Sequence, residues 1–148
     1  MKMSIVLCAS LALSGVVAAS EADDQAKVTK TINEIIDAAQ KKQIDRLESF
    51  HAYGPKFSKF EDDSLGRQDA AAGKKGERDG IMGVKSFNAK VSDLKVDVFG
   101  NSAVATMILA YEVDTGKEKA AGKDRATLVF VKEGGAWKIV HEHASPMK

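Results

Sequence analysis

The chain has 148 residues, with 22 basic side chains, 21 acidic side chains and a single cysteine. This length suits one domain with one hydrophobic core. The near-neutral charge, without a block of basic residues, argues against nucleic acid as a partner.

The N-terminus has the pattern of a secretory signal peptide. Met1-Lys2-Met3 is basic, residues 4–19 form an apolar run, and acidic residues begin at Glu21. The apolar run is shorter than the roughly 20 residues that a membrane span needs. We therefore expect residues 1–20 to be removed, after Ala19 or Ser20, and residues 21–148 to form one periplasmic or secreted domain. A buried N-terminal helix is the alternative.

Removal of this peptide would take Lys2 and Cys8 away. The remaining chain carries 21 basic and 21 acidic residues and no thiol, which excludes a disulfide and a cysteine nucleophile. No second hydrophobic run follows, so we expect no membrane association after export.

Two helices are expected first. Apolar residues recur at spacings of three and four over residues 28–39, which predicts a helix with one apolar stripe. A second short helix over residues 44–50 would turn Leu47 inward and end before Gly54-Pro55.

A short strand and a less regular segment follow. Residues 56–62 alternate as a strand does. Residues 64–83 combine alanines, which favour a helix, with four glycines, which weaken it. They predict a loosely held helix with loop ends, which Ser64 or Asp69 could cap.

The rest of the chain predicts consecutive strands. Residues 85–99 and 103–113 flank Gly100-Asn101, and a second hairpin reverses at residues 133–136. Residues 114–124 read as a polar connection. Helices followed by consecutive strands predict an α+β domain, with helices on one face of a curved antiparallel sheet.

The last strand has two distinct faces. Period-two alternation places Trp137, Ile139, His141, His143 and Ser145 on one face. Val140, Glu142 and Ala144 fall on the other. Neither face is plainly polar, so we expect the strand to be covered on both sides.

Three segments resemble the SnoaL-like proteins of the nuclear transport factor 2-like superfamily. They are the final strand Gly-Ala-Trp-Lys-Ile-Val-His-Glu-His-Ala-Ser at 135–145, the hairpin at 93–106 and the first strand at 57–62. The match covers about residues 24–146. The resemblance implies a cone-shaped curved sheet packed on the N-terminal helices, a cavity between them, and a homodimer through the outer sheet surface. It does not imply one function, because this fold hosts many.

The resemblance also implies which side chains line the cavity. From the strands these are Met107, Leu109, Tyr111, Leu128, Phe130, Val140 and Glu142. Tyr53, Phe57 and Phe60 would wall its mouth, although core residues would show the same pattern. A register slipped by one residue would instead turn Arg125, His141 and His143 inward. Arg125 could hold an anionic ligand in a bidentate way, or form an ion pair.

Glu142 is the candidate general acid or base, because burial in an apolar cavity raises the pKa of a carboxyl group. Ketosteroid isomerase, a member of this superfamily, has its base near the first strand, where Glu61 and Asp62 stand here. The alternative is a structural ion pair of Glu142 with Arg125 or Lys138. We expect Glu142→Gln to alter ligand binding or turnover while the fold stays intact.

His141 and His143 point the same way at a spacing that can hold a metal ion, but such a site needs a third ligand, His51 or a carboxylate. We interpret both as hydrogen-bonded histidines at a sheet or dimer surface, and we predict no metal and no other cofactor. The sequence contains no nucleophile elbow and no phosphate-binding glycine motif.

Three functions follow from these observations. The first is a non-catalytic protein that binds a small apolar or weakly polar molecule. The second is an isomerase, cyclase or hydratase that uses a pocket carboxylate as its base. The third is a structural or assembly module with a vestigial pocket. An open cavity with a carboxylate opposite a tyrosine favours the enzyme, whereas a carboxylate locked to an arginine favours the binding protein.

Overall fold

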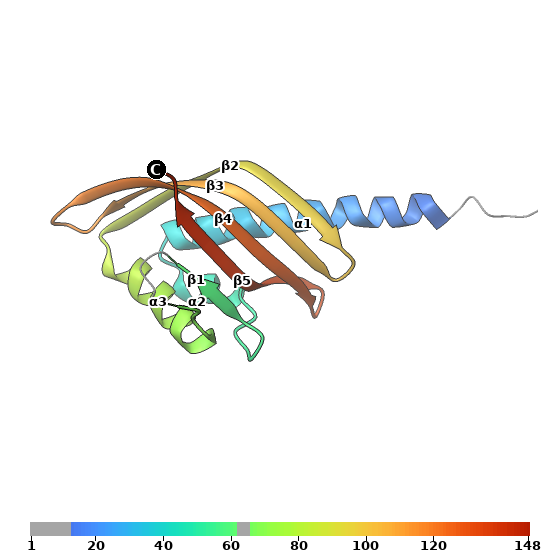
Figure 1. Ribbon diagram of the computed structural model, residues 1–148, viewed down its shortest axis with the longest axis horizontal. Helices are drawn as coiled ribbons and strands as arrows, with labels where there is room; N and C mark the ends of the chain where they lie inside the picture. Colours follow the sequence, from blue (N-terminus) through green and yellow to red (C-terminus); the bar gives the residue numbers. More distant parts are fainter. Residues whose placement is uncertain (1–12, 62–65) are drawn as a thin grey trace, which may run out of the picture.

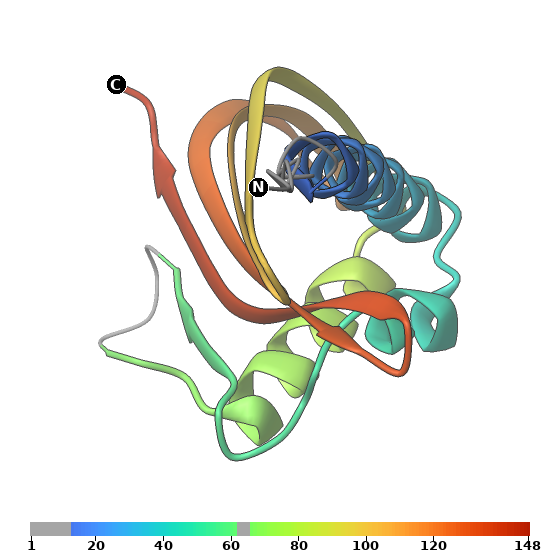
Figure 2. The ribbon, with the colours of Figure 1, turned by 90° about the vertical axis from the view of Figure 1, so that its right-hand side faces the viewer.

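The computed structural model describes residues 13–61 and 66–148, with side chains from Ser20 onward in the first helix. The elements in chain order are α1 (Leu13–Gln40), α2 (Ile44–Ser49), β1 (Ser58–Phe60), α3 (Ala70–Gly83), β2 (Ser86–Phe99), β3 (Ser102–Asp114), β4 (Lys119–Glu133) and β5 (Ala136–Pro146). The five strands form one sheet in the order β1-β5-β4-β3-β2. The sheet curves around α1, and α2 and α3 lie below it (Figure 2). The predicted α+β fold is confirmed.

The sheet is antiparallel except at one edge, where β1 pairs with β5 in parallel. The edge pairing follows from the chain path, because β1 enters the sheet from the helical region rather than through a hairpin (Figure 1). Hairpins join the other four strands. Gly100, Gly134 and Gly135 have positive φ angles of 64°, 57° and 80°, so the predicted glycine turns are confirmed.

α1 supplies one side of the core. Val28 and Ile32 are 0% and 1% exposed, and they pack with Phe130, Trp137 and Ile139 of the sheet. Spacings of three and four place the apolar residues of α1 on one face, as predicted.

The N-terminal part of α1 is tied to the sheet by an ion pair. Lys132 of β4 donates to both carboxylate oxygens of the buried Asp24, each at 2.9 Å. The first turns of α1 extend beyond the sheet (Figure 1). α1 begins at Leu13, within the predicted signal peptide, and residues 1–12 lie outside the described residues, so cleavage stays a prediction. None of the described helices is long and apolar enough to span a membrane.

Of two expectations about irregular segments, the helix within residues 64–83 and its Asp69 cap are confirmed, and the polar connection over residues 114–124 is wrong. Residues 70–83 form a continuous helix, α3, whose N-cap Asp69 accepts a hydrogen bond from the Ala72 N–H at 2.9 Å. Residues 119–124 belong to β4, because they pair with the long β3 from Asp114 to Leu109. Pairing with an existing strand outweighs their weak intrinsic preference for strand. Only residues 115–118 form the turn.

Candidate functional site

A pocket of about 630 Å³ opens between the concave face of the sheet and the helices. This volume lies in the usual range for small-molecule sites. Most of its wall is apolar and comes from α1, α2, α3 and the strands: Ile32, Ile35, Ile36, Ala39, Leu47, Ile81, Val84, Phe87, Met107, Leu109, Val113, Ala126, Leu128, Ile139, Ala144 and Pro146. The pocket is therefore an apolar chamber whose specificity must come from its few polar side chains.

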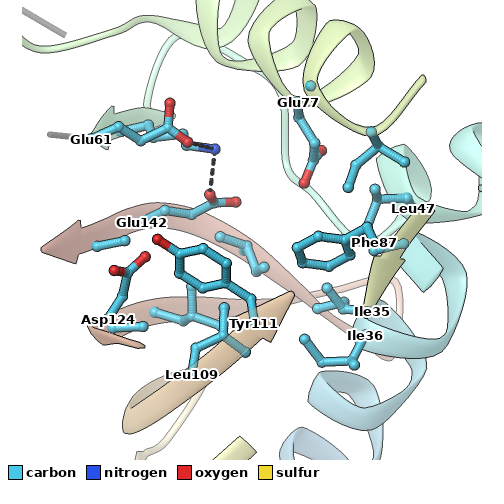
Figure 3. A pocket seen from close by; sticks show the side chains of 18 of the residues that line it. Ile35, Ile36, Leu47, Glu61, Glu77, Phe87, Leu109, Tyr111, Asp124 and Glu142 are labelled. Carbon is cyan, nitrogen blue, oxygen red and sulfur yellow. Dashed lines mark ion pairs between the residues drawn. The ribbon is translucent and has the colours of Figure 1, made fainter. Parts of the chain in front are cut away.

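The polar side chains of the pocket include Glu61, Glu77, Asp124 and Glu142 (Figure 3). They come from the residue that follows β1 and from α3, β4 and β5, which are far apart in the sequence. Tyr111 projects from β3 into the same pocket (Figure 3). A carboxylate and a phenol do share this pocket.

A β-bulge brings Glu142 into the pocket. Phe130 pairs with Ile139 and Val129 pairs with His141, so Val140 is the extra residue in β5. The bulge shifts the alternation by one residue, and the core residues Trp137 and Ile139 therefore share a face with Glu142. The predicted inward direction of Glu142 is right, but the two faces predicted for this strand are interrupted at Val140.

His51 contacts Glu142, and both of its ring nitrogens have partners. The backbone after α2 pairs with β5, through hydrogen bonds from Ala52 N to Ile139 O and from Ile139 N to Phe50 O, both 2.8 Å. The His51 side chain is 0% exposed. Its Nδ1 donates to the Leu47 carbonyl at 3.1 Å, so its Nε2 faces Glu142 Oε1 at 2.5 Å. Burial disfavours a charged ring, but the hydrogen bond and charge of Glu142 raise the pKa of His51.

Lys59 holds the other oxygen of Glu142. The Lys59 Nζ lies 3.1 Å from Glu142 Oε2 and 2.5 Å from Glu61 Oε1. Burial opposes ionisation of Glu142, but His51 and Lys59 together lower its pKa to about 2. Burial also opposes the charge on Lys59, yet Glu142 and Glu61 raise the pKa of its ammonium group. Glu142 is thus a fixed anion between two cations, not a carboxyl group with a raised pKa.

Glu77 has a different environment. Its Oε2 accepts a hydrogen bond from the Tyr53 hydroxyl at 2.8 Å, and Tyr53 stacks on His51 with ring centroids 4.9 Å apart. Its Oε1 lies 3.6 Å from His51 Nε2, beyond hydrogen-bond distance. Burial raises the pKa of Glu77, although His51 partly offsets it. Glu77 is therefore better suited than Glu142 to exchange a proton near neutral pH.

His51, Glu77 and Glu142 are also the one group of potential metal ligands within the described parts of the chain. One ligand atom from each lies within 4.8 Å of the others. A metal ion here would have to displace the short His51–Glu142 contact and would lie next to the Lys59 ammonium group. His141 and His143, the pair considered as metal ligands from the sequence, are not part of this group. The Ser58 hydroxyl lies within hydrogen-bond distance of His141 Nδ1, at 2.8 Å, and His143 is exposed.

The structure places some predicted pocket residues on the wall and others elsewhere. The wall includes Glu61, Met107, Leu109, Tyr111, Leu128, Glu142 and the exposed His143. Phe57 and Phe130 are instead buried in the core, and Tyr53 lies behind His51. Asp62 lies outside the described residues. The binding roles of these residues stay predictions.

Five further expectations need correction. Val140 leaves the pocket wall because it is the bulged residue of β5. Arg125, His141 and Phe60 are not on the wall either, since they alternate with residues that face inward; the Phe60 ring packs against His141 and is 42% exposed. The predicted partners of Glu142 are also wrong: Lys138 donates to the Ser49 carbonyl at 2.6 Å, and Arg125 is exposed.

Sequence reasoning missed Lys59, Glu77 and Asp124, and considered His51 only as a metal ligand. A signal for Glu77 was present. Gly73, Gly76 and Gly80 recur at spacings of three and four, so they share one helical face with Glu77. Glycines along one helix face indicate that this face lies close to another element or to a cavity, which the structure shows for α3.

Comparison with solved structures finds the same fold at low sequence identity. A proposed dehydratase of the NTF2-like family from Streptomyces avermitilis superposes with a TM-score of 0.78 and 17% identity, over 86% of this chain and 98% of that one. A proposed scytalone dehydratase from Novosphingobium aromaticivorans superposes with a TM-score of 0.77 and 12% identity, over 86% of each chain. An NTF2-like superfamily protein from Salmonella enterica superposes with a TM-score of 0.76 and 17% identity, over 86% of this chain and 93% of that one.

A search of curated proteins found none that matches the chain. The SnoaL-like domain family matches residues 28–148, which include every described pocket residue. The solved structures described as NTF2-like share the fold found here, a bent sheet over helices. The chain therefore belongs to the SnoaL-like domain family.

Proposed function

We propose that this protein binds a small, mainly apolar molecule in the pocket between sheet and helices, and that it does so without catalysing a reaction. The observation that carries the proposal is the state of Glu142. Both of its oxygens face cations, His51 at 2.5 Å and Lys59 at 3.1 Å, while the apolar chamber beside it is open. A carboxylate held in this way is a poor proton acceptor, because its pKa lies far below neutral pH.

Binding is tested by filling the chamber. Ala126 is half-buried on the pocket wall, so Ala126→Phe should occupy part of the space a ligand needs. We expect the uncharged dye Nile red to bind the unaltered protein at one site and Ala126→Phe to weaken that binding about tenfold or more. Fluorescence titration measures both.

The matched control is Ala121→Phe, which adds the same side chain at an exposed position of β4 outside the pocket. It should leave dye binding unchanged. Thermal unfolding of each variant checks that the fold is intact. Equal dye binding by all three proteins would place the dye on the surface and count against the proposed function.

An enzyme is the second candidate, and Glu77 is the observation that favours it. Its carboxyl group faces the pocket with a pKa raised by burial, and two structural neighbours are described as proposed dehydratases. Glu77 would then remove or return a proton on a ligand carbon or hydroxyl group. Turnover that Glu77→Gln abolishes would establish this candidate over the first.

We also propose that the exported protein is a homodimer through the outer face of the sheet. Val104, Ile108, Val129 and Val131 lie on that face, opposite the pocket, and all are only half-buried in the single chain. Such apolar side chains are suited to contact with a second copy. Native mass spectrometry of protein purified from its own periplasm should show a dimer that lacks residues 1–20 and retains a small molecule. A monomer of the full chain would contradict both proposals.

A further inference from the structure

The polar part of the pocket is acidic. Four carboxylate residues line the pocket, against one lysine and two histidines. Lys59 is already engaged by Glu61 and Glu142, and His51 by Glu142 and the Leu47 carbonyl. Neither Lys59 nor His51 is thus left over to receive an anionic ligand, and the second histidine, His143, is exposed to solvent.

Glu77 has one carboxylate oxygen, Oε1, that a ligand can reach with a hydrogen-bond donor. Tyr53 satisfies Oε2, and residues 13–61 and 66–148 provide no hydrogen bond to Oε1. The Glu77 side chain is only 14% exposed, and it projects from α3 into the pocket (Figure 3). A carboxylate oxygen so poorly solvated gains from any donor that reaches it, and gains most from a charged donor.

Apolar wall and acidic group together define a ligand class. We infer that the ligand has an apolar body and a protonated amine, which donates to Glu77 Oε1. The apolar body would lie against the side chains of α1 and the sheet, such as Ile35, Leu109 and Leu128. An alcohol would make a weaker neutral hydrogen bond to the same oxygen, and a carboxylate would be repelled by Glu77 and Glu142. This inference rests on the proposed function, because it names the class of molecule that the pocket takes.

Three compounds with one aromatic body test the inference. They are 2-(2-naphthyl)ethylamine, 2-(2-naphthyl)ethanol and 2-naphthylacetate, each titrated by calorimetry at pH 7 and by displacement of Nile red. We expect the amine to bind about tenfold more tightly than the alcohol, since a charge-assisted hydrogen bond is roughly twice as strong as a neutral one. The carboxylate should bind weakest.

Glu77→Gln should remove the preference for the amine and leave binding of the alcohol nearly unchanged. The control is Glu112→Gln, which removes the same charge at an exposed position of β3 that is not on the pocket wall. It should preserve the preference. Unfolding curves verify that both variants are folded, and the compound series on the unaltered protein needs no variant.

The outcomes separate this inference from the proposed function. Equal affinity for amine and alcohol, or tightest binding of the carboxylate, overturns the inference while the pocket remains a binding site. An amine preference that survives Glu77→Gln also overturns it, because the charge would then be recognised elsewhere. Failure of the dye and all three compounds to bind overturns the proposed function as well.

Discussion

Glu142→Gln should lower the free energy of unfolding by about 3 kcal/mol, the low end of the cost of removing one partner from a buried ion pair. Glu142 compensates two buried cations, His51 and Lys59. The low end applies because Lys59 keeps Glu61 and His51 can lose its proton. The sequence alone predicts an intact fold for this variant, and the structure reverses that expectation. Urea unfolding at pH 5.5 measures the difference.

The pH dependence of this difference provides a check. Glu142 has its pKa lowered from 4.5 to about 2 in the folded protein, so its contribution is complete above pH 4.5 and lost as the pH falls toward 2. His51 has a raised pKa, so its contribution is complete below pH 6.5 and lost as the pH rises through the folded value. The stability difference between unaltered protein and variant should therefore be largest between about pH 4.5 and 6.5.

A double variant separates charge imbalance from general damage. Lys59→Met combined with Glu142→Gln removes one of the two cations that lose Glu142 as a partner, so it should recover about 1 kcal/mol relative to Glu142→Gln alone. Additive losses in the double variant would contradict the account of Glu142 as a compensating charge. So would a cost below 1 kcal/mol for the single variant at pH 5.5.

Gly73→Ala should lower the free energy of unfolding by about 1–2 kcal/mol, even though alanine is the better helix former. A Cβ atom at Gly73 would lie 2.7 Å from Cε1 of the Phe57 ring. That ring is 4% exposed and packs against Tyr53 at a centroid distance of 4.8 Å, so it cannot turn aside freely. Overpacking should outweigh the gain of about 1 kcal/mol in helix propensity.

Gly80→Ala is the matched control in the same helix. Among the residues that the structure describes, no atom beyond its chain neighbours and the backbone of its own helix lies within 4 Å of the added Cβ, and the Gly80 backbone is helical. We expect Gly80→Ala to stabilise the protein by about 0.4–1 kcal/mol. Chemical denaturation should show that the free energy of unfolding falls in Gly73→Ala and rises in Gly80→Ala. A stabilising Gly73→Ala would show that Phe57 relaxes without cost.

Much of the fold could be predicted from local patterns. The apolar stripe of α1, the glycine turns at Gly100 and Gly134, and the core position of Trp137 all depend on spacing that is visible in the sequence. β4 was predicted too short, because residues 119–124 owe their extended form to β3 rather than to their own composition.

The site was less predictable, since it depends on residues that only the folded chain brings together. Glu142 was found from alternation along β5, but its partners lie 91 and 83 residues earlier in the chain. Nothing local to His51 or Lys59 indicates that they meet one carboxylate. The bulge at Val140 also has no clear sequence signature, and it turns Glu142, and not His141, toward the pocket.

The bulge at Val140 divides β5 into two parts that obey separate constraints. Before it, the side chains of Trp137 and Ile139 are packed in the core, where a change in side-chain volume lowers the stability of the fold. Beyond it, Ala144 borders the open space of the pocket, where a larger or smaller side chain meets little resistance. The first part of β5 thus serves the core, and the second part shapes the pocket.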